Sequence, residues 1–170
     1  MITRRDWQVL DFLKDYRAAY TSTLTKLFYP SEQVATRRLT ALVEMGEVKR
    51  ERGHVSLQYA YYIKKPAQLR HALALTTFYA DFAARYEVRH FAREPTIGSI
   101  RPDALIGYID GGRECVAFVE VELSNKGLDH KKYALFEQSE CKQHFGKMPK
   151  IIVVTDKNWE SCEKYEVWKI

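Results

Sequence analysis

Helix-stopping residues divide the first 65 residues of the chain into short segments. Pro30 ends a helix because its ring removes a backbone donor and clashes with the preceding turn. Gly46 is placed to end another helix in the left-handed conformation that glycine adopts without strain. Segments this short gain most of their stability by packing their apolar faces against one another. We therefore expect a small domain of short elements at the N-terminus.

Apolar residues at helical spacing predict three helices between these breaks. The first spans about 4–17, the second ends at Pro30, and the third ends at Gly46. Asp6 stands three residues after Thr3, so these two residues can form a capping box. Each helix begins beside a residue whose side chain can cap the first turn, namely Thr3, Thr21 and Ser31.

Two extended segments follow the third predicted helix, at about 47–52 and 57–63. Gly53-His54 between them is a suitable region for a hairpin turn. Three helices closed by a β-hairpin make a winged helix-turn-helix, which we predict for residues 1–65. The fold class is then α+β, because a second, mixed domain is expected in residues 66–170.

The excess positive charge of the chain lies in the same N-terminal third. Lys and Arg outnumber Asp and Glu by twelve to seven in residues 1–65, whereas fifteen of each balance in residues 66–170. The N-terminal third therefore carries the whole net charge of +5. A basic domain beside a neutral one is the asymmetry expected when one domain binds a polyanion. We expect that partner to be double-stranded DNA.

The predicted DNA contacts come from the third helix and the hairpin. In a winged helix the third helix enters the major groove, where Arg and Gln can read base edges. The basic residues of the hairpin suit phosphates or the adjoining minor groove. An alternative is that the same faces are solvated or contact a protein. The candidate DNA-binding residues are Gln33, Thr36, Arg37, Arg38, Lys49, Arg50, Arg52 and His54.

Residues 66–170 predict the order α-β-β-β-α-β, a mixed sheet with a helix on each side. Pro66 suits the start of a helix over 67–86, and a second helix is expected at about 127–145. Asp110-Gly111-Gly112 is a strong hairpin signal. Apolar and alternating runs predict strands at about 87–93, 102–109, 114–123 and 150–155, and the tail at 165–170 can add one more.

Three carboxylates are expected at one end of this sheet. Strand alternation places Glu120 and Glu122 on one face, and Asp103 begins the neighbouring antiparallel strand. Together they would suit Mg²⁺ or Mn²⁺, which could activate water for phosphodiester hydrolysis. Alternatively, the two glutamates lie on an exposed strand end and Asp103 caps a turn. Three lysines follow closely and could contact a phosphate, namely Lys126, Lys131 and Lys132.

The spacing of these acidic residues resembles a nuclease signature. Arg101-Pro102-Asp103, followed after an interval by Glu120-Val121-Glu122, is similar to the PD-(D/E)xK motif. The resemblance implies a restriction-endonuclease-like αβββαβ domain, with Asp103, Glu120 and Glu122 as catalytic and metal-binding residues. This chain departs from the motif at Glu122, where a lysine is common. That substitution weakens the case for an active enzyme.

The chain also resembles the replication-relaxation family, which is found on plasmids, integrative elements and phages. Membership would imply a winged-helix DNA-binding protein acting in replication, relaxation or mobilisation of a mobile element, or in its transcriptional control. The segments that carry the resemblance are Ile2-Thr3-Arg4-Arg5-Asp6, Ala35-Thr36-Arg37-Arg38-Leu39, His71-Ala72-Leu73-Ala74, Arg101-Pro102-Asp103-Ala104, Phe118-Val119-Glu120-Val121-Glu122 and Pro149-Lys150-Ile151-Ile152-Val153-Val154-Thr155.

Three functions follow from these patterns. The favoured one is a non-catalytic DNA-binding factor, whose partners would be a relaxase or replication proteins. The second is a Mg²⁺- or Mn²⁺-dependent nuclease, and the third is a degenerate nuclease fold that recruits proteins or forms a homodimer. Three widely spaced cysteines without a Cys-x-x-Cys pair favour a reducing, cytoplasmic location over a disulfide framework or a zinc site. The sequence has no apolar run of the roughly 18 residues that a membrane span needs.

Overall fold

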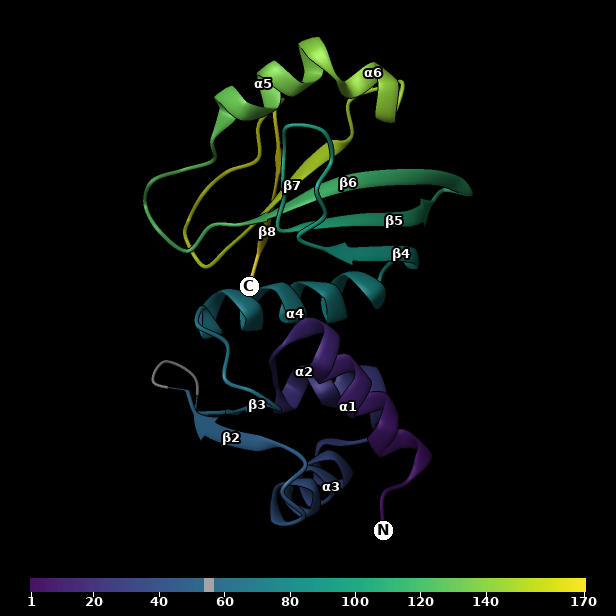
Figure 1. Ribbon diagram of the computed structural model, residues 1–170, viewed down its shortest axis with the longest axis vertical. Helices are drawn as coiled ribbons and strands as arrows, with labels where there is room; N and C mark the ends of the chain where they lie inside the picture. The colour runs from purple at the N-terminus through teal and green to yellow at the C-terminus, as the bar shows by residue number, and fades with distance from the viewer. Residues whose placement is uncertain (54–56) are drawn as a thin grey trace. The chain divides into compact units, whose positions relative to one another are not determined.

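The computed structural model describes residues 1–53 and 57–170 and combines helices with β-sheets (Figure 1), which confirms the α+β fold class. It divides into two compact units, Met1–Ala80 and Asp81–Ile170, here called unit 1 and unit 2. Within the described ranges, none of the helices is both long enough and apolar enough to span a membrane.

Helix α1 (Arg4–Tyr16) begins with the predicted capping box. The backbone N–H of Thr3 donates to Asp6 Oδ2 at 2.7 Å, and the N–H of Asp6 donates to Thr3 Oγ1 at 3.3 Å. Such reciprocal bonds satisfy backbone donors that have no partner within the helix. The start of α1 is therefore determined locally, by two side chains that are close in the sequence.

Helices α2 (Thr21–Phe28) and α3 (Glu32–Glu44) lie on either side of the predicted proline break. Ser31 caps α3 as predicted, because its hydroxyl accepts a bond from a backbone N–H of the first turn at 3.3 Å. The prediction that Thr21 caps α2 is wrong. Thr21 is the first helical residue, and Tyr20 before it makes no side-chain cap. The preceding backbone is extended because it pairs with another strand.

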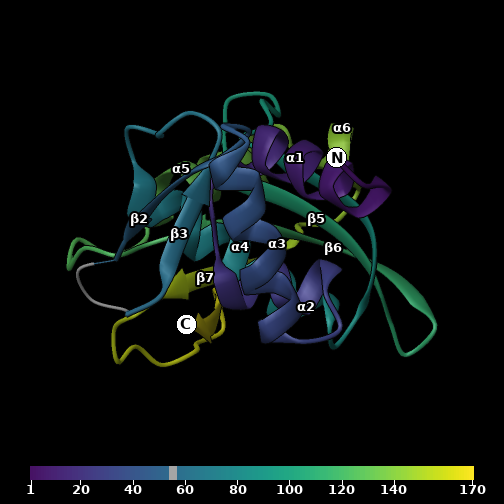
Figure 2. The same cartoon turned by 90° about the horizontal axis from the view of Figure 1, so that it is seen from below.

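The apolar faces of α1, α2 and α3, whose backbones Figure 2 shows from below, supply most of the core of unit 1. Leu13, Leu24 and Leu39 each come from a different helix and are fully buried. Burying one such side chain stabilises the fold by roughly 1.5–3 kcal/mol, so helix packing dominates the local propensities. Gly46 follows α3 with φ +79°, the left-handed conformation predicted for it.

The sheet of unit 1 has the order β1-β3-β2, and both pairings are antiparallel. Its strands are β1 (Ala19–Tyr20), β2 (Lys49–Arg52) and β3 (Tyr59–Tyr62). The β2–β3 pair matches the predicted hairpin strands. The sequence did not indicate β1, because two residues are too short to show an alternating pattern.

Helix α4 (Leu69–Ala83) crosses the division between the two units. The sequence suggested a boundary at Pro66, but the first part of α4 packs within unit 1. Leu73 joins a buried cluster with Ala18 and neighbouring residues. The hydroxyl of Thr76 donates to the carbonyl of Ala18 at 2.9 Å. An amphipathic pattern shows that a helix has an apolar face, but it does not show what that face packs against.

The sheet of unit 2 has the order β4-β5-β6-β7-β8. The pairings β4–β5 and β5–β6 are antiparallel, and β6–β7 and β7–β8 are parallel. The predicted hairpin is confirmed: Gly111 and Gly112 have φ of +55° and +77°, as a type I′ turn requires. The strands are β4 (Glu87–Arg93), β5 (Ala104–Asp110), β6 (Arg113–Val121), β7 (Lys150–Thr155) and β8 (Glu166–Lys169).

One face of this sheet is covered by α5 (His130–Ser139) and α6 (Cys141–His144) (Figure 1). Phe118 of β6 packs against Tyr133 and Phe136 of α5, with ring centroids 5.6 and 5.9 Å apart. The single helix predicted at 127–145 is therefore wrong. The helix is interrupted at Glu140, which lies between α5 and α6. The carboxylate of Glu140 accepts a hydrogen bond from the backbone N–H of Ser99 at 2.9 Å, a contact with a distant part of the chain.

Replacing Phe118 with Ala should lower the free energy of unfolding by about 3–5 kcal/mol, because the change leaves a cavity in the core. Phe118 is 0% exposed, whereas Val116 on the same face of β6 is 39% exposed. Val116→Ala is the matched control and should cost less than about 1 kcal/mol. Urea unfolding followed by circular dichroism measures both changes, and equal losses would contradict the packing described here.

Candidate functional site

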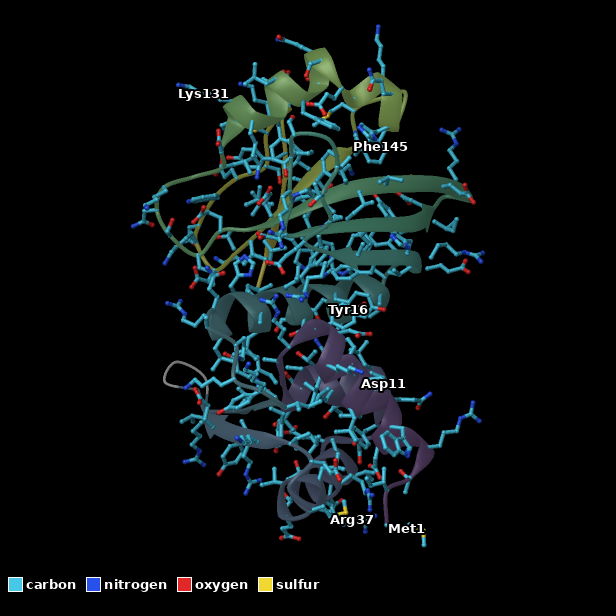
Figure 3. All side chains as sticks on the ribbon, viewed as in Figure 1. Met1, Asp11, Tyr16, Arg37, Lys131 and Phe145 are labelled. Carbon is cyan, nitrogen blue, oxygen red and sulfur yellow. The ribbon has the colours of Figure 1, made fainter. Side chains whose placement is uncertain are left out.

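The outward stripe of α3 carries three of the predicted contact residues. Gln33, Thr36 and Arg37 are exposed, whereas Ala35 and Leu39 are buried on the opposite side. The spacing follows the 3.6-residue turn of the helix. The guanidinium of Arg37 extends from α3 toward solvent (Figure 3). This surface therefore presents one cation and two groups that can donate and accept hydrogen bonds.

Arg50 connects the β2–β3 pair to this stripe. Its Nη1 donates to the hydroxyl of Thr40 on α3 at 3.2 Å. Its guanidinium carbon lies 4.4 Å from the centre of the Tyr59 ring, and that of Arg52 lies 5.5 Å from the same ring. Cation–π contacts of this kind are worth about 0.5–1 kcal/mol at exposed sites. Both arginines therefore lie on one face of β2, and Arg50 also bonds to α3.

Lys49 lies on the other face of β2, because successive strand residues point to opposite sides. Glu51 shares that face and accepts bonds from the hydroxyl of Tyr62 at 2.9 Å and from Lys65 at 2.6 Å. Lys49 was predicted to contact DNA together with Arg50 and Arg52, but it lies on the opposite face of β2 from them. The remaining hairpin residue of that group, His54, lies outside the described residues.

Arg38 is not part of the outward stripe, because its side chain extends toward α1. Its guanidinium forms an ion pair with Asp6, whose side chain is fully buried. Burial alone would raise the pKa of Asp6, but the hydrogen bonds from Arg38 and Thr3 outweigh it and hold this pKa below its ordinary value. Arg38 is therefore a structural partner of a buried carboxylate, which differs from the base or phosphate contact predicted for it.

Glu120 is positioned by β6 and α5 together. It shares the face of Phe118 and lies under α5, with a side chain only 13% exposed. Its Oε1 accepts bonds from Lys132 Nζ at 2.7 Å and from the hydroxyl of Tyr133. Burial raises the pKa of Glu120, the bonds from Lys132 and Tyr133 oppose that rise, and Asp103 adds to it. Tyr133 was not predicted as a site residue, because its contact with β6 depends on where α5 packs.

The other two predicted metal ligands have partners of their own. Asp103 Oδ2 accepts a bond from the N–H of Val121 at 2.7 Å, just where β6 ends. Glu122 follows β6, and its Oε1 accepts a bond from the N–H of Ser124 at 2.8 Å within the next turn. Over residues 1–53 and 57–170, the structure has no group of three His, Cys, Asp or Glu side chains arranged to hold a metal ion. The three-carboxylate metal site stays a prediction.

A cavity of about 850 Å³ lies elsewhere in unit 2, between α5, the start of β7 and residues 161–166. Its rim mixes lysines with glutamates, and Lys150 is ion-paired with Glu166 at 2.8 Å. Glu120 and Asp103 do not line it. The cavity is therefore separate from the predicted carboxylate site.

Comparison with family models, with curated proteins and with solved structures finds no match to this chain. The resemblances to the replication-relaxation family and to the PD-(D/E)xK motif stay predictions. The functional argument therefore depends on the geometry described above.

Replacing Asp6 with Asn should lower the free energy of unfolding at pH 7 by about 1–3 kcal/mol, because charge-assisted hydrogen bonds to Arg38 and Thr3 are weakened. The folded pKa of Asp6 lies below its unfolded value, so its stabilising contribution is complete above about pH 4. That contribution is lost as the pH falls through the folded pKa. The difference between the wild type and Asp6→Asn should therefore shrink in acid.

Urea unfolding at a series of pH values measures this difference. Asp11→Asn is the matched control, since Asp11 is exposed on the same helix. A difference between the wild type and Asp6→Asn that stays constant down to low pH would contradict the ion pair.

Proposed function

We propose that unit 1 is a winged helix-turn-helix that binds double-stranded DNA. The observation that carries this proposal is the Arg50–Thr40 hydrogen bond, which joins the arginine-bearing face of β2 to the outward stripe of α3. On one side of it stands the outward stripe of α3, with Gln33 and Arg37. The face of β2 that carries Arg50 also carries Arg52. With the helix and the strand pair joined in this way, α3 can bind in a DNA groove while β2 contacts the phosphates beside that groove.

The chemistry of these side chains matches duplex DNA. Arg can bond two acceptors of guanine, and Gln can bond the donor and acceptor of adenine in the major groove. Arg50 and Arg52 suit the phosphates that flank the groove, because a planar guanidinium matches two phosphate oxygens. The excess of Lys and Arg in residues 1–65 supports the same partner through long-range attraction.

The biological setting is proposed from the sequence resemblance. A protein of this kind would act at a plasmid, integrative element or phage, in replication, relaxation, mobilisation or transcriptional control. Its further partners would be a relaxase, replication proteins or a second copy of this chain. Unit 2 carries 14 Lys and Arg against 15 Asp and Glu, so it has little attraction to DNA of its own. Unit 2 would then serve as the module that contacts these partners.

Replacing Arg37 with Ala should weaken binding to a selected duplex by about 1–3 kcal/mol, because a base or phosphate contact is lost. Fluorescence anisotropy with duplexes enriched from a random pool measures the dissociation constant. Arg113→Ala removes the same charge from the exposed first residue of β6 and is the matched control. Affinity should also fall steeply with added salt, since phosphate contacts release counterions. Equal affinities of Arg37→Ala, Arg113→Ala and the wild type would exclude α3 from the interface.

A second candidate function, a metal-dependent nuclease, is favoured by the position of Lys132. Its Nζ lies 2.7 Å from Glu120 Oε1, so a lysine stands beside the motif acid although Glu122 occupies the motif's lysine position. Asp103 is close enough to Glu120 to influence its pKa. Mg²⁺ is commonly held by one or two carboxylates and waters, so Asp103 and Glu120 fit such an ion without Glu122. When bound, the ion would supply an activated water and stabilise charge on a phosphodiester.

Cleavage of supercoiled plasmid DNA in Mn²⁺ tests this candidate. Asp103→Asn and Lys132→Met should each lower the cleavage rate at least about 100-fold, because a ligand or a phosphate-stabilising cation is lost. Glu122→Gln is the matched control and should retain most activity, since Glu122 bonds within its own turn. Thermal unfolding confirms that each variant is folded. A wild type that leaves supercoiled, nicked and branched DNA intact would exclude the nuclease.

A further inference from the structure

A cavity of about 450 Å³ lies between the start of α1 and the adjoining face of α3. Arg4 and Arg5 line it from α1, and Arg37 and Arg38 line it from α3. Asp6 is the acidic residue in its lining. Arg4 and Arg5 are not among the DNA contacts predicted from the sequence, so this cavity adds a basic site next to the outward stripe of α3.

Asp6 cannot neutralise this group of arginines. Its oxygens already accept bonds from the N–H of Thr3 at 2.7 Å, from the Thr3 hydroxyl at 2.8 Å and from Arg38 Nε at 3.3 Å. Among the described residues, Arg4, Arg5 and Arg37 form no ion pair with an acid. Guanidinium groups that share one small cavity repel each other unless an anion lies between them.

The location of Arg4 and Arg5 also favours an anionic ligand in this cavity. They occupy the first turn of the 13-residue helix α1, where the unpaired N–H groups create positive potential. Cations are unfavourable at that end of a helix, whereas anions are stabilised there. Two consecutive arginines in the first turn therefore suit a ligand that carries more negative charge than Asp6 supplies. A planar guanidinium also matches the spacing of two phosphate oxygens.

We infer that this cavity binds a tetrahedral oxyanion, namely a backbone phosphate of the duplex that α3 contacts. Arg37 borders both the cavity and the outward stripe, so the phosphate would lie directly beside the groove. Arg4 and Arg5 contact the phosphate, and Arg38, held by Asp6, forms a fixed wall of the site. The inference rests on the proposed function, because the phosphate belongs to the same DNA.

The test compares Arg4→Gln/Arg5→Gln with the wild type on one selected duplex and on a random duplex. Loss of one phosphate contact should lower the slope of log affinity against log salt by about 0.9. Affinity for both duplexes should fall about tenfold at low salt, because a phosphate contact acts on all sequences alike. The ratio of the two affinities should stay unchanged, since phosphates carry no base information. Arg4 and Arg5 are exposed, so the double variant should keep the unfolding temperature of the wild type.

Lys14→Gln is the control variant, because Lys14 is exposed on α1 outside this cavity. A wild type that binds no duplex overturns the proposed function itself. A wild type that binds while the double variant keeps the salt slope and affinity of Lys14→Gln overturns the phosphate site alone. Titration calorimetry with inorganic phosphate identifies the source of the anion. Phosphate binding that the double variant loses, with an unchanged slope on duplex, would assign the cavity to a free anion and overturn the inference.

Discussion

The buried carboxylate of Asp6 is the interaction on which the geometry of unit 1 depends. It holds the first turn of α1 through Thr3 and holds α3 through the guanidinium of Arg38. An uncompensated buried charge costs about 3–5 kcal/mol, so both sets of partners must remain in place. Thr3 at the start of α1 and Arg38 on α3 both bond to the carboxylate oxygens of Asp6. This shared contact holds α1 and α3 in one relative orientation. The surfaces that these helices present to solvent are set by that orientation.

Adjacent residues take different roles because each backbone geometry turns them to different sides. Arg37 and Arg38 are about 100° apart around α3, so one faces solvent and the other faces a buried acid. Lys49 and Arg50 point to opposite faces of β2, which leaves Arg50 and Arg52 next to Tyr59. Charge counting along the sequence cannot separate such neighbours. The periodicity of the element that contains them does so.

The features predicted correctly are set by residues that are neighbours in the chain. The capping box of Thr3 and Asp6, the left-handed Gly46 and the Gly111-Gly112 turn each involve residues that are close in the chain. The bounds predicted for β4 and β7 also agree with the structure. The errors concern distant partners: β1 forms only because β3 lies beside it, and the helix after Asp129 breaks where Glu140 bonds to Ser99. Tertiary contacts override local propensity at these places.

The sequence by itself determined the order of the longer helices and strands, the basic N-terminal third and the α+β class, because these follow from periodicity, turn residues and charge. Only the tertiary structure decided which basic and acidic side chains meet. It placed Arg50 against Thr40, Lys132 against Glu120, and Arg38 against Asp6. The physical reason is that such contacts join residues far apart in the chain. Their geometry depends on how whole helices and strands pack, which no local pattern encodes.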